Sequence, residues 1–287
     1  MSGYESELEA TSENLVFCWE CGHHARIFQE DAGEPPAFPG VFGACLEEFF
    51  LMKIYVHNYL ESLSISSDLY EEKHADCIGN AFGLSAHHYL SDINLDYWIW
   101  KNSQEDIIGK AQYRKWFLNK DKKKYERREL EQIFKNFDIM LAFARSNING
   151  HSANNSLCYY WAHASFDLRL ACKIVYEIAG SAEMGIVALN DYLVKSDILA
   201  YANLFIAKKE IIFEYYNWLF PVLEIFIKRS SFMYYPDKYQ QRAPGYIAER
   251  LFSFWCLHKK GLKIYETKAN VEESAGDKDS RLRFAYP

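Results

Sequence analysis

The 287-residue sequence lacks any long hydrophobic run. Its longest apolar segments, 211–213 and 218–227, are bounded or interrupted by charged and turn residues, and a membrane-spanning helix needs roughly 18–20 apolar residues. The N-terminus is acidic, with Glu5, Glu7 and Glu9, and has no basic segment of the kind that opens a secretory signal peptide. We therefore expect a cytoplasmic protein.

Cysteine is scarce and forms no disulfide framework, because the seven cysteines are odd in number and scattered. The run CWECGHH places Cys18, Cys21, His23 and His24 close together. A structural zinc site needs four ligands, usually as two well-spaced pairs, and Cys45 is the sole other thiol nearby. The sequence favours loop residues over a zinc centre here, and we predict no metal site.

Positive charge is in deficit, with 32 Lys and Arg against 39 Asp and Glu, for a net charge of −7. This balance argues against bulk nucleic-acid binding. Nine Lys and Arg residues nevertheless fall within 110–128. Most of this run is typical of a solvated loop and helix start, but Arg114 and Lys115 directly follow a predicted strand.

The composition changes near residue 52. Residues 1–51 contain the Gly/Pro stretch GEPPAFPGVFG and show no helical or strand period, whereas Met52 opens a first strand, MKIYV. Two interpretations stay open: a genuine, poorly structured extension, or an over-long gene prediction with Met52 as the native start. We expect one domain over 52–271 and a loose polar tail over 272–287.

Within 52–271, apolar periodicity predicts alternating strands and helices. Strands are expected over 53–56, 107–111, 137–144, 198–207 and 262–265. Helices are expected over 129–136, 160–178, 208–228 and 246–258. Strands separated by helices predict an α/β fold, with a mixed sheet flanked by helices and a helix-rich C-terminal half.

The strand over 107–111 delivers polar residues to its carboxyl end, namely Gln112, Tyr113, Arg114 and Lys115. Ligands of open α/β sheets bind at that edge. Guanidinium and ammonium groups there suit a pyrophosphate, which arginine can bind through two parallel hydrogen bonds. An ordinary surface ion pair would also account for these cations.

Four separated blocks carry a family resemblance. They read DINLDYWIWKN at 92–102, QYRKWF at 112–117, NLFIAKK at 203–209 with WLF at 218–220, and YQQRAPGYIAERL at 239–251. In this order they resemble the bacterial polysaccharide-biosynthesis glycosyltransferases grouped as domain of unknown function 4422. The resemblance extends from Met52 to about Val271.

The resemblance implies a GT-A-like, Rossmann-like fold and a hexosyltransferase activity. The donor would be a nucleotide sugar, such as a UDP-linked galactose or galactofuranose. The acceptor would be a growing capsule, exopolysaccharide or O-antigen chain, or a lipid-linked oligosaccharide at the inner face of the plasma membrane. The alternative is a catalytically impaired relative that binds a nucleotide sugar or glycan as a scaffold in polysaccharide assembly.

Glycosyl transfer also requires charge stabilisation of the departing diphosphate, by fixed cations or by a divalent metal. The sole Asp-x-Asp motif, Asp277 to Asp279, lies in the polar tail, where no strand orients it. We therefore expect Arg114, with Lys115, to stabilise the diphosphate; Mg²⁺ or Mn²⁺ is the alternative.

An inverting reaction needs a carboxylate to deprotonate the acceptor hydroxyl, and the resemblance points to Asp92, Asp167 and Glu249. Asp92 replaces the family's glutamate and is one methylene shorter. Asp167 lies in HASFDL, on a helix whose other face is apolar. Glu249 could instead form a buried structural ion pair with Arg242 or Arg250.

The other expected site residues have ordinary packing or capping roles as alternatives. The donor-binding group is Asp76, Gln112, Tyr113, Arg114 and Lys115. The sugar- and acceptor-binding group is Trp98, His163, Asn203, Gln240 and Arg242. The sequence departs from the family at Gln112, where the family has a histidine, and in the loop around Asp76. These departures predict altered specificity or reduced activity.

Overall fold

A computed structural model of the chain describes residues 50–58, 67–74, 81–84, 87–112, 115–148, 150–179 and 186–271. Residues 1–49, with the CWECGHH run, and the tail from 272 to 287 lie outside the described residues. Three of the expected donor-binding residues, Asp76, Tyr113 and Arg114, also lie outside them.

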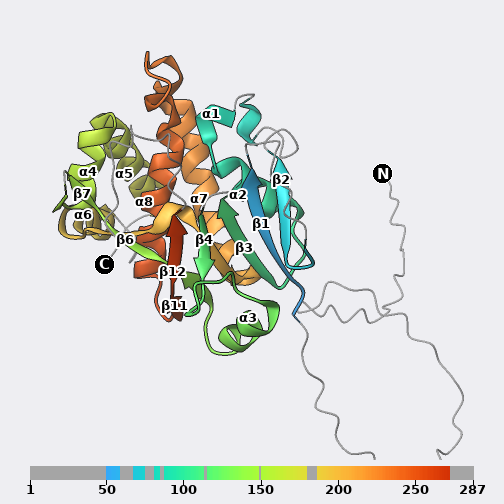
Figure 1. Cartoon of the computed structure of the whole chain (residues 1–287). Helices are drawn as coiled ribbons and strands as arrows, with labels where there is room; N and C mark the ends of the chain where they lie inside the picture. Colours follow the sequence, from blue (N-terminus) through green and yellow to red (C-terminus); the bar gives the residue numbers. More distant parts are fainter. Residues whose placement is uncertain are drawn as a thin grey trace, which may run out of the picture. The chain divides into compact units, whose positions relative to one another are not determined.

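A mixed eight-stranded sheet forms the centre of the described domain (Figure 1). The spatial order is β2–β1–β3–β10–β5–β11, and β4 pairs with both β3 and β12. The strands β1, β2 and β3 are parallel, while β10 runs antiparallel to β3 and β5. The strands of this sheet are β1 Met52–Asn58, β2 Tyr70–His74, β3 Ile107–Gln112, β4 Lys115–Leu118, β5 Ile139–Leu141, β10 Phe205–Lys208, β11 Ile264–Glu266 and β12 Lys268–Val271.

Helices flank this sheet, as the α/β prediction requires. The helices are α1 His87–Leu90, α2 Ile93–Asn102, α3 Arg127–Phe134, α4 Asn155–Ala162, α5 Ser165–Ala179, α6 Ile186–Lys195, α7 Lys209–Arg229 and α8 Ala243–His258. Short 3₁₀ turns connect them at η2 Ala81–Gly83, η3 Tyr201–Asn203, η4 Phe232–Tyr234 and η5 Gln240–Arg242. In Figure 1, α4, α5 and α6 gather on the side of the sheet away from β1 and β2.

Strand alternation divides the core into two layers. Tyr55, Ile108 and Phe205 belong to a hydrophobic core that also contains side chains of α2, α7 and α8. The alternate residues Ile54 and Ile107 belong to a second core, which includes the apolar side chains of α3. Successive strand residues point to opposite faces, so each buried strand contributes to both layers.

The centre of the sheet is closely packed at Gly109 in β3. A Cβ atom there would lie 2.7 Å from Cγ1 of Ile54 in β1 and 3.2 Å from Cγ1 of Ile206 in β10. Glycine therefore lets these neighbouring side chains cover the strand, as is common where close approach is needed. This packing fixes β3, whose carboxyl end carries Gln112.

Two predicted elements are broken in the structure. The single helix expected over 160–178 is wrong, because α4 and α5 are separated at His163 and Ala164. The single strand expected over 198–207 is also wrong, because β9 Ile198–Ala200 and β10 are separated by η3 and lie in different sheets. Each break contains a single buried polar residue, His163 or Asn203, which is too weak a signal in the sequence to mark the end of an element.

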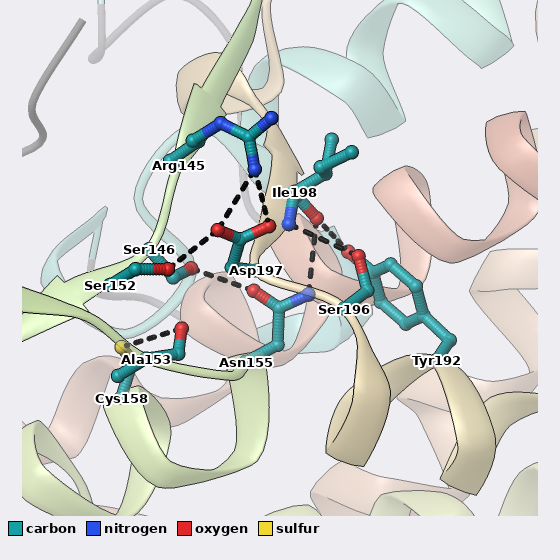
Figure 2. A network of polar contacts seen from close by, with 10 residues as sticks. All are labelled: Arg145, Ser146, Ser152, Ala153, Asn155, Cys158, Tyr192, Ser196, Asp197 and Ile198. Atoms are coloured by element: carbon teal, nitrogen blue, oxygen red, sulfur yellow. Dashed lines mark hydrogen bonds and ion pairs between the residues drawn. The ribbon is translucent and has the colours of Figure 1, made fainter.

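The strand expected over 137–144 likewise divides into β5 and β6 Phe143–Arg145, and β6 pairs with β9 in a separate small sheet. A second small sheet consists of β7 Asn147–Ile148 and β8 His151–Ser152. Figure 2 shows the polar network that holds this region together. Asp197 accepts hydrogen bonds from Arg145 at 2.9 and 3.0 Å and from Ser152 at 2.7 Å.

The same network fixes the start of α4 (Figure 2). The buried Asn155 side chain accepts a hydrogen bond from Ser146 Oγ at 2.6 Å and donates one to the Ile198 carbonyl at 3.0 Å. Asn154 caps the helix by accepting from the Leu157 amide at 2.9 Å. The position of α4 therefore depends on contacts with β9, far along the chain.

No helix in the described ranges combines the length and the apolar character that crossing a bilayer requires.

Candidate functional site at the carboxyl edge of β1 and β3

The candidate site lies at the carboxyl ends of two adjacent parallel strands. His57 in β1 and Gln112 in β3 are paired in register. His57 is fully buried, and Gln112 is half-buried at the last position of its strand. Polar side chains therefore face the edge at which α/β proteins bind their ligands.

Asp92 meets this edge from the turn between α1 and α2. It precedes the first residue of α2 but makes no side-chain cap to the helix, so its carboxylate is available to the sheet. Gln112 Nε2 donates a hydrogen bond to Oδ2 of Asp92 and another, at 3.2 Å, to the Ala202 carbonyl. Nδ1 of His57 lies 3.5 Å from Oδ1 of Asp92.

These surroundings keep Asp92 ionised. Burial by itself would raise the pKa of Asp92, but the hydrogen bond from His57 and the charges of Lys110 and Lys115 outweigh it. The pKa of this carboxyl is therefore held well below its ordinary value. The ionised carboxylate at this edge can accept a hydrogen bond from a substrate hydroxyl, and its low pKa makes it a weaker base than an unperturbed aspartate.

A buried ion pair supports this arrangement from the core. Lys110 Nζ lies 2.6 Å from Oδ2 of Asp96, and the Tyr216 hydroxyl donates to Oδ1 at 2.8 Å. Lys110 and Asp96 are almost completely inaccessible to solvent. Because Lys110 is in β3 and Asp96 in α2, the pair ties the helix that follows Asp92 to the strand that ends in Gln112.

The turn η3 forms another side of the site. Ala202 and Asn203 both adopt left-handed backbone conformations, with φ of 52° and 55°. Such conformations are costly in residues other than glycine and cluster at functional sites. Oδ1 of Asn203 is buried and makes no hydrogen bond within the described part of the chain, and Lys115 Nζ lies 5.2 Å from the centre of the Tyr201 ring.

Arg242 completes the cluster from the start of α8. Its Nη2 donates to Ser91 Oγ at 2.8 Å, and Ser91 Oγ donates in turn to Oδ1 of Asp92 at 3.4 Å. The structure thus brings together Asp92, Gln112 and Arg242, which come from three of the four sequence blocks. We call this cluster, with His57 and Ser91, the Asp92 site.

Asp167, another candidate base, is fully buried in the first turn of α5. Its two oxygens accept hydrogen bonds from the Tyr235 hydroxyl at 3.1 and 3.2 Å. Burial raises the pKa of Asp167 to about 6, although the Tyr235 hydrogen bond opposes the shift. This carboxylate lies inside the helical packing and outside the Asp92 site.

His163, which ends α4, is buried against aromatic rings. Its ring stacks on Tyr246 with a centroid distance of 3.8 Å. Burial, reinforced by the charges of Arg250 and Arg242, lowers the pKa of His163 to about 2, so the imidazole stays neutral. Arg242 also lies over Tyr246, at 5.4 Å, and so links this aromatic group to the Asp92 site.

Gln240 and Glu249 are committed to protein contacts. The Gln240 amide donates to the Ala162 carbonyl at 2.7 Å and accepts from the Ala164 amide at 3.2 Å, which joins the broken ends of α4 and α5. Glu249 lies 3.6 Å from Arg250 Nη1.

The aromatic block in α2 serves packing. Trp98 packs edge-on against Tyr55 at 5.2 Å, and Lys73 Nζ lies 4.0 Å above its ring. Trp100 contacts Phe220 in α7 at 4.9 Å and hydrogen-bonds to Asn217.

Sequence analysis missed His57 and Ser91. A signal for His57 was present, because it is the polar residue near the end of the apolar strand MKIYV, the position that α/β sheets use for ligands. Ser91 carried no comparable signal, since its contact with Arg242 spans 151 positions.

The described residues contain no group of three or more His, Cys, Asp or Glu side chains able to hold a metal ion. His57 and Asp92 would offer two ligands, but they contact each other. The described residues of this edge therefore do not by themselves form a donor set for a divalent cation.

The raised pKa of Asp167 leads to a stability prediction. Its folded value of about 6 exceeds the ordinary 3.8, so the native state binds more protons than the unfolded state and stability falls as the pH rises from about 4 to 6. Asp167→Asn, which keeps an acceptor for Tyr235, should raise the unfolding free energy at pH 8 by up to about 3 kcal/mol. In urea titrations the gain should be about half as large at pH 5; an equal gain at both pH values would contradict the assignment.

Together these features define a GT-A-like fold, a mixed α/β sheet flanked by helices with a polar site at the carboxyl edge of its parallel strands. The chain belongs to the family described as "Domain of unknown function (DUF4422)", which matches residues 62–260.

A solved structure described as that of the WbbM bifunctional glycosyltransferase in its apo form shares this fold. The TM-score is 0.63 and the sequence identity 22%, and the match covers 78% of the present chain and 46% of that chain. The chain thus spans about half the length of that protein. Comparison with curated proteins gave no match.

Proposed function

We propose that the protein is a glycosyltransferase that moves a hexose from a nucleotide-sugar donor, such as UDP-galactose or a galactofuranose form, to a growing cell-surface glycan. The observation that carries the proposal is the meeting of Asp92, Gln112 and Arg242 at the carboxyl edge of a GT-A-like sheet. The fold shared with a bifunctional glycosyltransferase supports it.

The donor diphosphate would bind beside the carboxyl end of β3 and the start of β4. Lys115 is the first residue of β4, and its positive charge helps to lower the pKa of Asp92. Arg114, the preceding residue in sequence, lies outside the described residues and would supply a second cation. Fixed cations stabilise charge that develops on a departing diphosphate.

Asp92 would act as the general base of an inverting displacement. The acceptor hydroxyl gives its proton to Asp92 while the hydroxyl oxygen bonds to the anomeric carbon. The bond between that carbon and the diphosphate breaks, and the diphosphate leaves with the electron pair. Gln112 and His57 hold the carboxylate in place. We assign Asp167 a structural role because its carboxylate is buried against Tyr235.

The acceptor would approach between η3 and the start of α8. Arg242 and Asn203 offer a donor and an amide at these two positions, and both groups can hydrogen-bond sugar hydroxyls. A capsule, exopolysaccharide or O-antigen chain on a lipid carrier is the acceptor class that we propose, with the reaction at the inner face of the plasma membrane.

Turnover of a panel of nucleotide sugars with mixed glycan acceptors tests the proposal. The expected result is release of the nucleoside diphosphate together with a glycosylated acceptor. Saturable binding of a nucleotide sugar without turnover would instead favour the scaffold function. Neither binding nor turnover with any donor would refute both.

Transfer is expected to persist in EDTA, because Lys115 and Arg114 are proposed to stabilise the diphosphate. The rate with excess EDTA should stay within about threefold of the rate with added Mg²⁺ or Mn²⁺. This change is far smaller than the loss of rate expected when a metal that stabilises the transition state by several kcal/mol is removed. Activity that disappears in EDTA and returns with metal would contradict the cationic arrangement.

A further inference from the structure

Exposed apolar side chains concentrate on one helical group. Seven of the ten large apolar residues found exposed among the described residues belong to α4, α5 and α6. The seven are Leu157, Tyr160, Trp161, Phe166, Tyr176, Ile178 and Val194. Scattered exposed apolar residues are normal on protein surfaces, whereas a concentration of them marks an interaction site.

The strongest part of this concentration is one face of α4. Leu157, Tyr160 and Trp161 are spaced i, i+3 and i+4, so they lie on the same side of the helix, and 50%, 41% and 60% of their respective surfaces are exposed. The opposite side, with Cys158 and Tyr159, is buried. Because α4 is apolar on its outer side as well as its inner side, that outer side is typical of a surface that binds a partner. We call these three residues the α4 face.

The exposed charges of the segment that contains the α4 face are cationic, whereas the neighbouring helix α6 carries an exposed ion pair, Lys195 with Asp191. From Asn155 to Lys173 the sequence contains one acidic residue, Asp167, and its carboxylate is buried. Arg169 and Lys173 on α5 are exposed, and Lys173 is 4.0 Å from Glu177 in a solvent-facing contact. In a chain of net charge −7, this stretch therefore presents apolar and cationic groups together.

The α4 face is also structurally connected to the Asp92 site. The last residue of α4, Ala162, accepts the hydrogen bond from Gln240. Gln240 opens η5, which ends in Arg242, and Arg242 binds Ser91 next to Asp92. A surface that binds α4 would thus hold the Asp92 site at a fixed position relative to itself.

We propose that the α4 face binds the interfacial region of an anionic lipid bilayer. Tyr160 and Trp161 have the amphipathic rings that reside at headgroup level, and Leu157 would enter the acyl boundary. Arg169 and Lys173 would attract anionic headgroups. The biological role of this binding rests on the proposed function, because binding would bring the Asp92 site to a lipid-linked acceptor.

Co-sedimentation of the full-length protein with vesicles tests the inference. Binding should be at least about tenfold stronger to vesicles of phosphatidylglycerol and phosphatidylcholine than to phosphatidylcholine alone, and should weaken with salt. Leu157→Ser with Trp161→Ser should lower vesicle binding at least about tenfold. The matched control, Leu51→Ser with Tyr234→Ser, exchanges an exposed leucine and an exposed aromatic residue outside α4, α5 and α6 and should leave binding unchanged.

Three outcomes would overturn the inference: no binding by the wild type, equal loss in the control variant, or a dimer that the α4 variant converts to monomer. The last outcome would assign the face to a second copy of the chain. Transfer to a water-soluble acceptor separates this test from the proposed function. The α4 variant should keep that activity. If the wild type shows no transfer to the soluble acceptor, the proposed function is refuted, and the vesicle-binding result still decides the inference about the α4 face.

Discussion

Replacing Asp92 by asparagine is expected to lower kcat for sugar transfer by about 10²–10⁴-fold, the range typical of a lost general base. The amide keeps the size of the side chain and an oxygen that can accept the hydrogen bond from Gln112. It cannot take the proton of the acceptor hydroxyl. Binding of the nucleotide sugar, measured by calorimetry, should therefore change little while the rate of transfer falls.

Asp167→Asn is the matched control for this substitution, because it removes another buried candidate base without altering the Asp92 site. It should leave kcat near the wild-type value. If Asp167→Asn abolishes transfer and Asp92→Asn retains it, the base is Asp167 and our assignment is wrong. Near-normal thermal unfolding of Asp92→Asn is required for the comparison to count.

Lys110→Met is expected to lower the unfolding free energy by about 3–5 kcal/mol, the cost of leaving one partner of a buried ion pair alone. Asp96 would lose its cation in β3 and retain its bond from Tyr216. Burial already raises the pKa of Asp96, so without Lys110 this carboxyl should favour its neutral form. Its folded pKa would then exceed the unfolded one by more than in the wild type, so the loss should be larger at pH 8 than at pH 5.

The double variant Lys110→Met with Asp96→Asn separates lost attraction from uncompensated charge. Because the asparagine keeps an oxygen for Tyr216 and carries no charge, the double variant should recover much of the stability that Lys110→Met loses. Urea titrations of the two single variants and the double variant measure the coupling. A loss below about 1 kcal/mol in Lys110→Met would show that the pair does not brace α2 against β3.

Local sequence signals predicted the elements whose pattern is self-contained. The apolar strands around 53–56 and 107–111 and the helices over 208–228 and 246–258 agree with β1, β3, α7 and α8 within a few residues. Each has a complete period of its own and polar or glycine residues at its ends.

Elements defined by distant contacts could not be predicted in the same way. The sequence pattern predicted no helix over the block DYWIW, which lies in α2 and packs its rings on α7. The short strand β4 depends on β12, which lies about 150 positions later. The break at His163 depends on the Gln240 side chain, which pairs with the backbone on both sides of it.

The candidate site shows the same division. The family blocks identified Asp92, Gln112 and Arg242, and the position of Gln112 after an apolar strand gave an independent reason to expect a ligand edge. Sequence could not show that Ser91 connects Arg242 to Asp92, nor that Asp167 is buried. These facts depend on how α1, α5 and α8 pack.

Calorimetric titration of nucleotide sugars into the full-length protein tests the central claim, that cations after β3 bind an activated sugar beside Asp92. We predict saturable binding of at least one UDP-sugar to the wild type. The variant Arg114→Met with Lys115→Met should bind it at least about a hundredfold more weakly, as expected for the loss of two charge-assisted contacts. Equal affinity in both proteins would contradict the claim.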